Sequence, residues 1–323
     1  MTQFLITGGA GYLGSSLVRQ LVERGDRVRR LSRGERTAEP SAHASIEDFR
    51  GDVTSFADVE RALLGVDVIL HLAAQTSIYV ADADPLADLE ANVRPMLGLL
   101  EACRARGGCP TVILASTATL AGIAPKLPVA ADAVDDPATI YELHKQSAER
   151  YLAHYCAKGV VRGCSLRLAN VYGPGPKSSR PDRGILNGMV RRALAGETLK
   201  IYGTGEFVRD YIYVDEAAGA FLCAAAQAHA PAVNGRHFFL ASGTGHTLAE
   251  AVHLVARLVG EHTGKAVAVE HVPWPPTLAP IESRNFVADT EPLWQAAGFR
   301  AKLTLEQGLR RTIEYFSQAE GQA

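Results

Sequence analysis

The chain has 323 residues, of which 47% are hydrophobic and 21% are charged. This length suits one large α/β unit or two coupled domains, and the composition excludes a disordered chain. The formal net charge of −2 gives no basic field that would gather nucleic acid, although 33 Lys and Arg residues leave room for a local anion site.

The cysteines and the N-terminus indicate a cellular compartment. The five cysteines show no C-x-x-C spacing and no neighbouring His cluster, which argues against a disulfide framework and against a zinc site. The first residues, MTQFLITGGAGYLG, lack the basic segment and the long apolar run of a signal peptide, and no window reaches about 18 uninterrupted apolar residues. We expect a cytoplasmic protein with free thiols, no bound metal and no membrane segment.

The first half of the chain alternates short β-rich runs with helical stretches. The sequence predicts strands at 4–7, 27–32, 66–74, 110–117 and 165–173, and helices at 15–25, 56–65, 89–107 and 140–158. Strands that alternate with helices form βαβ crossovers. We therefore expect an α/β fold with a doubly wound parallel sheet of the Rossmann type.

The pattern changes after residue 173. Residues 173–184 are rich in turn formers, and they precede predicted helices at 185–196 and 246–260, a strand at 237–242 and a loop at 273–280. We expect residues 1–170 to form the Rossmann domain, with returning segments around 205–250. Residues 171–323 are expected to form mainly a smaller C-terminal lobe.

A glycine-rich turn, TGGAGYLG (7–14), lies between the first predicted strand and the first predicted helix. In a dinucleotide-binding turn, Gly8 would permit the tight bend, Gly11 would let the backbone approach a pyrophosphate, and Gly14 would let the helix pack on its strand. The helix N-terminus, at Tyr12 and Leu13, would present free N–H groups to the phosphates. The alternative is a βα turn without a ligand, and its place in a βαβ chain favours dinucleotide binding.

The residue that closes the second strand often selects the dinucleotide. A carboxylate there binds the ribose 2′-hydroxyl of NAD, whereas a nearby Arg accommodates the 2′-phosphate of NADP. The second strand ends in LSRGER, with Ser32 and Arg33 at its end and Arg36 close behind. This pattern predicts NADP(H) in preference to NAD(H). The alternative is that these arginines are exposed loop charges.

The segment YELHK (141–145) places a phenol and an ammonium about one helical turn apart. A Tyr is a poor base at neutral pH unless a nearby cation stabilises its phenolate, and Lys145 could do this for Tyr141. Ser116 and Thr117 fall at the C-terminal end of a predicted strand, where parallel sheets bind their ligands. Either hydroxyl could hold a substrate oxygen on which charge develops.

With these pieces the chain resembles the extended short-chain dehydrogenase/reductase family, in particular its NDP-sugar epimerase, dehydratase and 4-ketoreductase branch. The likeness covers almost the whole length. It rests on eight segments: TGGAGYLG (7–14), GDVT (51–54), HLAAQTS (71–77), ASTATLAG (115–122), YELHK (141–145), RLANVYGPG (167–175), IYGTGEFVRDYIYVDE (201–216) and ADTEPLWQAAGF (288–299).

The resemblance implies a role for each matching residue. Tyr141 would be the acid/base, Lys145 its electrostatic partner and a cofactor contact, and Thr117 the third member of the catalytic triad, with Ser116 as the runner-up. The dinucleotide would further be contacted by Asp52, Val53, Leu72, Ala73, Ala74 and Asn92. The NDP-sugar would be held by Ser77, Thr117, Asn170 and Arg209. Other readings stay open: Asp52 could cap a turn, Asn92 could be an ordinary polar helix residue, and Arg209 could pair with Asp210 or Asp215.

Three departures from the family pattern stand out. Family members usually have Tyr where this chain has Ala121. In 4,6-dehydratases an Asp-Glu pair follows the triad Thr, but Ala118 and Thr119 stand here, so dehydration is disfavoured. A second phosphate-binding Arg of many epimerases is replaced by Ala279, and Arg284 is the nearest substitute.

Three functions follow from this resemblance. The first is an NADPH-dependent NDP-4-keto-6-deoxyhexose 4-ketoreductase, which the predicted NADP(H) preference favours. The second is an NAD-dependent NDP-sugar 4-epimerase, and a remote third is a non-catalytic dinucleotide-binding sensor. The helices at 89–107 and 140–158 match those that form dimer interfaces in similar proteins, so a homodimer is expected.

Overall fold

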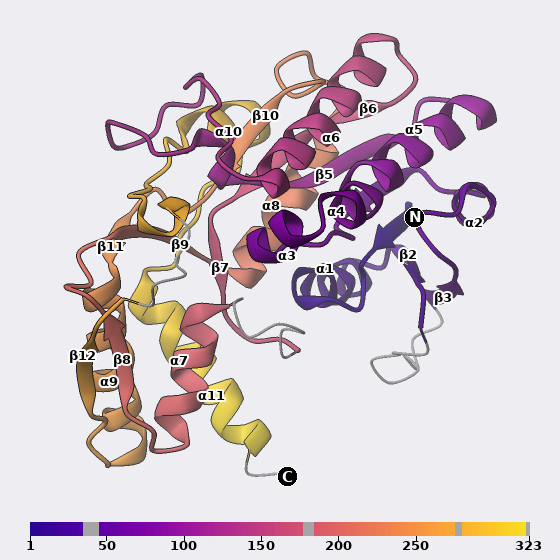
Figure 1. Cartoon of the computed structure of the whole chain (residues 1–323). Helices are drawn as coiled ribbons and strands as arrows, with labels where there is room; N and C mark the ends of the chain where they lie inside the picture. The colour runs from indigo at the N-terminus through magenta and orange to yellow at the C-terminus, as the bar shows by residue number, and fades with distance from the viewer. Residues whose placement is uncertain (35–44, 177–183, 275–279, 321–323) are drawn as a thin grey trace.

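The computed structural model describes residues 1–34, 45–176, 184–274 and 280–320 (Figure 1). Within these ranges a seven-stranded sheet forms the centre of the larger lobe, and all of its paired strands run parallel. In spatial order its strands are β10 (His237–Leu240), β6 (Arg162–Leu168), β5 (Thr111–Thr117), β4 (Val68–His71), β1 (Gln3–Thr7), β2 (Arg27–Ser32) and β3 (Ile46–Arg50). The predicted doubly wound Rossmann-like fold is confirmed.

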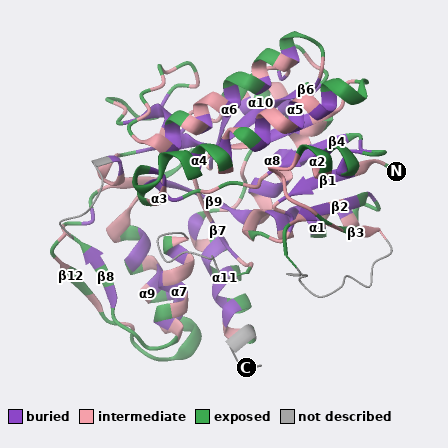
Figure 2. Cartoon of the chain, turned by 45° about the vertical axis from the view of Figure 1, so that its right-hand side comes forward, coloured by how far each residue is buried: buried purple, intermediate pink, exposed green. Residues whose placement is uncertain are grey.

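Helices cover both faces of this sheet, and each face has its own apolar core. One face packs against α1 (Tyr12–Glu23), α8 (Val214–Ala226) and α10 (Glu291–Ala297). The other packs against α2 (Phe56–Ala62), α5 (Arg94–Arg106) and α6 (Ile140–Ala157). Two short helices, α3 (Ile78–Ala83) and α4 (Pro85–Asn92), lie against α6. In Figure 2 the strands of this sheet are largely buried between the two helical layers.

The smaller lobe is built around a third apolar core (Figure 1). Its helices are α7 (Ile185–Leu194), α9 (Leu248–Thr263) and α11 (Leu305–Glu320). Two small sheets accompany them: β8 (Leu199–Tyr202) with β12 (Val269–Val272), and β7 (Asn170–Tyr172), β9 (Val208–Tyr213) and β11 (Gly245–Thr247). Two 3₁₀ turns, η1 (Ala118–Ala121) and η2 (Pro280–Ser283), complete the described elements.

The division of the chain at residue 170 stays a proposal. In its favour, strands β1 to β6 belong to the large sheet, and the returning segments supply β10 and α8. A later segment also returns, because α10 packs against α8 and β10. We therefore propose residues 1–170 plus these segments as one domain and most of 171–323 as the other.

The predicted helix at 89–107 is two helices. α4 ends at Asn92 and α5 begins at Arg94, with Val93 between them. The break coincides with Pro95, which lacks an N–H and whose ring would clash with the preceding turn of a continuous helix. The break leaves Asn92 at the end of α4, where its side chain is 3% exposed.

The predicted strand at 165–173 is also interrupted. β6 stays in the large sheet up to Leu168, whereas β7 begins at Asn170 and pairs with β9 in the small sheet. The chain thus leaves one sheet for the other at Ala169. Asn170 is thereby carried out of the large sheet and placed beside Tyr211 of β9.

Arg167 is a buried cation that joins β6 to α6. Its side chain is 2% exposed and binds Asp135 at 2.6 Å and Glu149 at 2.7 Å. The substitution Arg167→Met should lower the free energy of unfolding by about 3–5 kcal/mol, because it leaves two carboxylates without their counter-charge. Urea denaturation would measure this. The control Arg257→Met removes two exposed ion pairs, with Glu261 and Glu306, and should have a much smaller effect; equal effects would contradict the prediction.

Candidate active site

The glycine turn forms a cradle at the start of α1. Gly8 has a φ of +74°, and a Cβ on Gly14 would lie 2.3 Å from the carbonyl oxygen of Gly8, so neither position accepts a larger residue without strain. Gly11 is the N-cap of α1 and brings no capping side chain. The first N–H groups of the helix are therefore available to an anion. This arrangement fits the pyrophosphate of a dinucleotide.

Tyr12 links this cradle to the smaller lobe. Its hydroxyl donates to the carbonyl of Gly173 at 2.8 Å and accepts from Nδ2 of Asn187 on α7 at 3.0 Å. Burial raises the pKa of Tyr12, and the hydrogen bond from Asn187 opposes that shift only in part. The side chain of Leu13 packs against the core of the large sheet. Both side chains are thus engaged elsewhere, and the groups that these two residues can offer to a phosphate are their backbone N–H groups.

The end of β2 carries no carboxylate, and its arginine, Arg33, has an exposed side chain. Ser32 donates to the carbonyl of Gly34 at 3.4 Å. Arg30, two residues earlier, is held by two hydrogen bonds of 2.7 Å to Asp48 of β3. Arg36 lies outside the described residues.

Two further loops lie at the C-terminal edge of the large sheet, the edge at which the glycine turn follows β1. After β3, Oδ1 of Asp52 accepts from both N and Oγ1 of Thr54 at 2.9 Å, so Asp52 does cap a turn, and Val53 packs against the core. After β4, the N–H groups of Leu72 and Ala73 donate to Thr7 at 3.2 Å.

The second of these loops touches the glycine turn directly. A Cβ on Gly8 would lie 3.0 Å from the nitrogen of Ala73, and Ala74, the next residue, is exposed. The structure thus brings the 72–74 loop, which the sequence assigns to the dinucleotide, against the turn that would hold the pyrophosphate.

The predicted triad comes from the end of β5 and the start of α6. Thr117, Tyr141 and Lys145 are 8%, 7% and 4% exposed, and η1, which follows Thr117, packs against α6. Oγ1 of Thr117 lies 2.8 Å from Oγ1 of Thr119. The ring of Tyr141 packs with Ile281 of η2, so it lies where the smaller lobe meets α6. Ser116, the alternative to Thr117, is buried, and its hydroxyl has no hydrogen-bond partner among the described residues.

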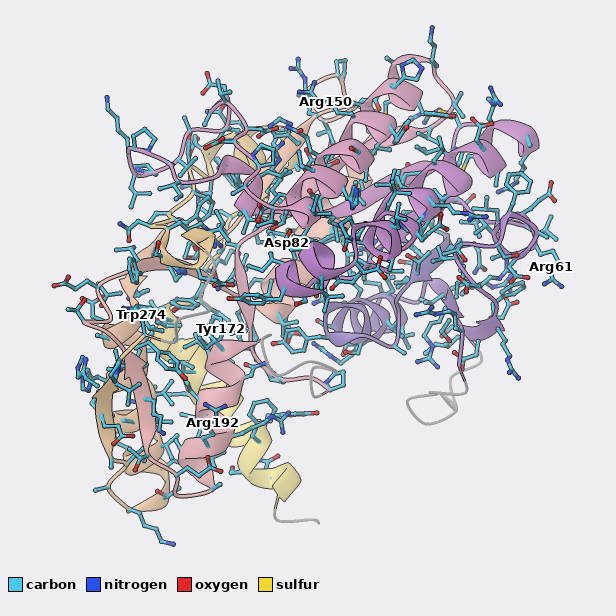
Figure 3. All side chains as sticks on the ribbon, viewed as in Figure 1. Arg61, Asp82, Arg150, Tyr172, Arg192 and Trp274 are labelled. Carbon is cyan, nitrogen blue, oxygen red and sulfur yellow. The ribbon has the colours of Figure 1, made fainter. Side chains whose placement is uncertain are left out.

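A capping box fixes the first turn of α6, which carries Tyr141. Glu142 accepts from the N–H of Thr139 at 2.8 Å, and the Thr139 side chain caps the third residue of the helix in return. Asp82 on α3 accepts from the N–H of Ile140 at 3.1 Å, and Figure 3 shows it beside this end of α6. Arg150, two turns further along, lies on the outer, exposed side of the same helix (Figure 3).

Lys145 is a buried amine whose charge is easily lost. Burial lowers the pKa of Lys145 to about 8, while Glu149 and Asp88 oppose that shift. His71 of β4 is also buried, and burial together with the charge of Lys145 lowers its pKa to about 3. His71 is therefore neutral at physiological pH and binds Thr7 at 2.9 Å. Near neutral pH the site holds one cationic amine beside a buried phenol.

Asn92 and Ser77 are buried beside this site. Nδ2 of Asn92 donates to the carbonyl of Gln75 at 3.0 Å and to Asp88 at 2.9 Å. Its Oδ1 is buried and has no hydrogen-bond partner within the described part of the chain, so an acceptor is available to a ligand. Asn92 is not an ordinary exposed polar residue of a helix. Ser77 is 2% exposed and donates its N–H to Oε1 of Gln75.

Arg209 on β9 does not pair with either of the acids that follow it. Its guanidinium donates to the main-chain carbonyls of Val208, Glu282 and Arg284. Asp210 accepts instead from Ser242, Gly243 and Ala288, and Asp215 binds Arg19. Carbonyl partners orient the guanidinium without neutralising its charge, which suits a group that receives an anion.

Arg284, the nearest substitute for the second phosphate-binding arginine, lies in the same lobe as Arg209. Arg284 donates to the carbonyl of Ile281 at 2.9 Å, next to the segment that holds Arg209. Two aromatic residues that were not assigned to the site, Tyr172 and Trp274, also lie in this lobe, and Trp274 stacks on Tyr202 (Figure 3). Ala279 lies outside the described residues. No group of His, Cys, Asp or Glu side chains among the residues described could hold a metal ion.

Sequence reasoning missed three residues of this site: Gln75, Asp88 and His144. All three are joined by hydrogen bonds around the carboxylate of Asp88. A signal was present, because Asp88 lies four residues before Asn92 and so shares its helix face, and His144 directly precedes Lys145.

Comparison with known proteins identifies the family of this chain. A model described as the NAD dependent epimerase/dehydratase family matches residues 4–240. The chain belongs to this family. This chain is 29% identical over 318 residues to a UDP-glucose 4-epimerase of Mycolicibacterium smegmatis, and the match covers 97% of each of the two chains.

Solved structures agree with this assignment. The crystal structure of the UDP-glucose 4-epimerase of Thermotoga maritima with UDP-glucose has a TM-score of 0.86 and 28% identity, and covers 99% of this chain and 100% of its own. The Thermus thermophilus UDP-glucose 4-epimerase in complex with NAD has a TM-score of 0.82 and 31% identity, with 98% and 100% covered. The resemblance to the extended short-chain dehydrogenase/reductase family is confirmed, and the family member is an enzyme of the epimerase/dehydratase type.

The predicted preference for NADP(H) is wrong. The family is NAD-dependent, and the Thermus thermophilus neighbour was solved with NAD. The physical basis of the prediction is weak as well, because Arg33 is an exposed loop side chain, which is the alternative that the sequence left open. The 4-ketoreductase gains no specific support from these relatives, and the epimerase alternative fits them better.

Proposed function

We propose that this family member is an NAD-dependent 4-epimerase of nucleoside-diphosphate sugars, with a UDP-hexose as its substrate. The observation that carries the proposal is the buried set Thr117, Tyr141 and Lys145 beside a glycine cradle, in a chain similar over its full length to UDP-sugar 4-epimerases. The acid/base pair of a dehydratase is replaced by Ala118 and Thr119. Elimination therefore lacks its proton donor and acceptor.

In this reaction Tyr141 removes the proton of the C4 hydroxyl and later returns it. Lys145 stabilises the phenolate form of Tyr141 by its charge, and Thr117 holds the C4 oxygen by a hydrogen bond. Nicotinamide, when bound, would supply the hydride acceptor and donor. The burial of all three side chains excludes water from the proton transfer and strengthens the effect of the Lys145 charge.

The cofactor would be held by the cradle residues and by the edge loops. We assign to it Gly8, Gly11, Tyr12, Leu13, Gly14, Ser32, Arg33, Asp52, Val53, Leu72, Ala73, Ala74, Asn92, Tyr141 and Lys145. For Tyr12 and Leu13 the contact is through backbone N–H groups, since their side chains are engaged elsewhere.

The substrate would lie between the lobes. We assign its diphosphate to Asn170 and Arg209, and its sugar to Ser77 and Thr117. The guanidinium of Arg209, oriented by carbonyls only, supports this assignment.

A homodimer in the cytoplasm also stays a proposal. Leu86 and Leu89 on α4 and Leu143 and Tyr151 on α6 are exposed apolar side chains on two packed helices. No helix among the described residues is long and apolar enough to span a membrane.

The test is turnover of UDP-glucose with a defined cofactor. We expect conversion to its C4 epimer without net change in absorbance at 340 nm, supported by NAD and not by NADP. NAD should also raise the melting temperature more than NADP does at equal concentration, because a bound ligand stabilises the fold in proportion to its occupancy. Stoichiometric oxidation of NADPH with a 4-keto sugar, and no epimerisation, would instead establish the reductase.

A further inference from the structure

The carboxylate of Asp88 is the centre of a buried hydrogen-bond cluster next to the triad. Its side chain is 0% exposed. Oδ1 accepts from Nε2 of Gln75 at 2.7 Å and from Nδ2 of Asn92 at 2.9 Å, and Oδ2 lies 2.7 Å from Nδ1 of His144. These partners come from three segments: the loop after β4, α4 itself and α6.

Neighbouring contacts fix the orientation of the two amides that bind Asp88. Nδ2 of Asn92 also donates to the carbonyl of Gln75, and Nε2 of Gln75 donates to the carbonyl of Ser77 at 2.8 Å. Both contacts require the nitrogen of each amide to face as it does, so both amides offer Asp88 only N–H donors. Neither amide could accept a carboxyl proton, and Nδ1 of His144 could do so only in the tautomer that leaves it unprotonated. With the proton on Nδ1 of His144, the carboxylate form accepts from all three partners.

The titratable groups around Lys145 come from two helices and from the sheet. Glu149 lies one turn further along α6, but it is bound at 2.7 Å by Arg167, which also binds Asp135. From β4 the ring of His71 faces the amine and is neutral at physiological pH.

Two more groups complete the surroundings of Lys145. Tyr141 lies one turn earlier on α6, and Asp88 is on α4, which packs against α6 and brings its charge close enough to oppose the lowering of the Lys145 pKa. Glu149 has the larger effect on the pKa of Lys145 but is bound by Arg167, whereas Asp88 has no arginine partner among the described residues.

We propose that Asp88 is a positioning residue of the active site: its carboxylate fixes α6 against the loop after β4 and, together with Glu149, adds negative charge that favours the protonated form of Lys145. This inference rests on the proposed function, because it assigns Asp88 to the same proton transfer. Asp88 acts through Lys145 and His144 and does not itself touch the substrate.

The test compares Asp88→Asn with Asp84→Asn. Both remove one carboxylate from α4 with almost no change in shape. Asp84 is the exposed N-cap of that helix, a position where Asn is equally accepted. The titration of Lys145 is followed by NMR of protein labelled with ¹³C-lysine, and its signal is identified by its absence from Lys145→Met.

Removal of a nearby opposite charge should lower the titration midpoint of Lys145 by about one pH unit in Asp88→Asn. Asp84→Asn should leave the midpoint unchanged. Since the pKa of Lys145 is about 8, Asp88→Asn should lower turnover about five-fold at pH 8 and hardly at pH 6. An unchanged midpoint in a folded Asp88→Asn protein would overturn the proposal, as would an equal loss of turnover at every pH.

A second variant covers the case in which Asp88→Asn does not fold. His144→Asn keeps the carboxylate and removes its imidazole partner, so the Lys145 midpoint should stay or rise, and a fall would overturn the proposal. The NMR titration needs no substrate. Absence of epimerisation in the unmodified enzyme would therefore refute the proposed function and leave the assignment of Asp88 to be decided by the titration.

Discussion

Tyr141→Phe is expected to reduce epimerase turnover by about 10²- to 10⁴-fold, the range that a positioned acid/base group contributes. The substitution removes one hydroxyl and keeps the ring that packs against Ile281. The fold and the glycine cradle should therefore be unaffected. NAD binding, measured by isothermal titration calorimetry, should change little, and the loss should appear in kcat and not in KM.

A matched control is available on the same helix. Tyr151 is an exposed Tyr of α6, and Tyr151→Phe makes the same chemical change ten residues away from the site. It should retain full turnover. If Tyr141→Phe kept more than about a tenth of the activity, the phenol would not be the proton carrier that the mechanism requires.

The fold could be predicted where the hydrophobic pattern is local. Short apolar strands that alternate with helices gave the parallel sheet, and the glycine turn located its first crossover. α8 was missed because VDEAAGAFLCAAA is apolar on most sides, being buried between the sheet and α1, and so lacks a helical period. α11 could have been found, since Leu305, Leu309 and Phe316 recur on one face.

The candidate site was predictable to the extent that its chemistry lies in short motifs. YELHK and the glycine turn are such motifs, and the structure buries their side chains as the proposed function needs. The spacing of Asp88 and Asn92 could have placed Asp88 on the same helix face, but its role could not be predicted, because it depends on contacts with Gln75 and His144 from other segments. The cofactor prediction failed for a related reason: the residue type at the end of β2 does not reveal whether an arginine such as Arg33 is only an exposed loop charge.

Lys145→Met is expected to reduce turnover by about 10- to 10³-fold, because a cation close to a phenol lowers its pKa by about one to three units. In the unmodified enzyme the pKa of Lys145 is about 8, so turnover should fall as the pH rises through 8 and the amine loses its proton. In Lys145→Met the pH profile of turnover should lack this fall above pH 8. Lys145→Arg keeps a charge at every accessible pH and should also lack the fall, whatever activity it retains.

The same amine links stability to pH in a defined direction. Its pKa is about 8 in the folded enzyme and near its ordinary value of 10.5 in the unfolded chain. Between these values the unfolded chain binds the extra proton, so the free energy of unfolding should rise with pH across this window. Below pH 8 the cost of burying the cation is fully present. Lys145→Met should flatten this rise in urea denaturation between pH 8 and 10.5, and an identical slope in both proteins would show that Lys145 is not the buried amine on which the proton transfer depends.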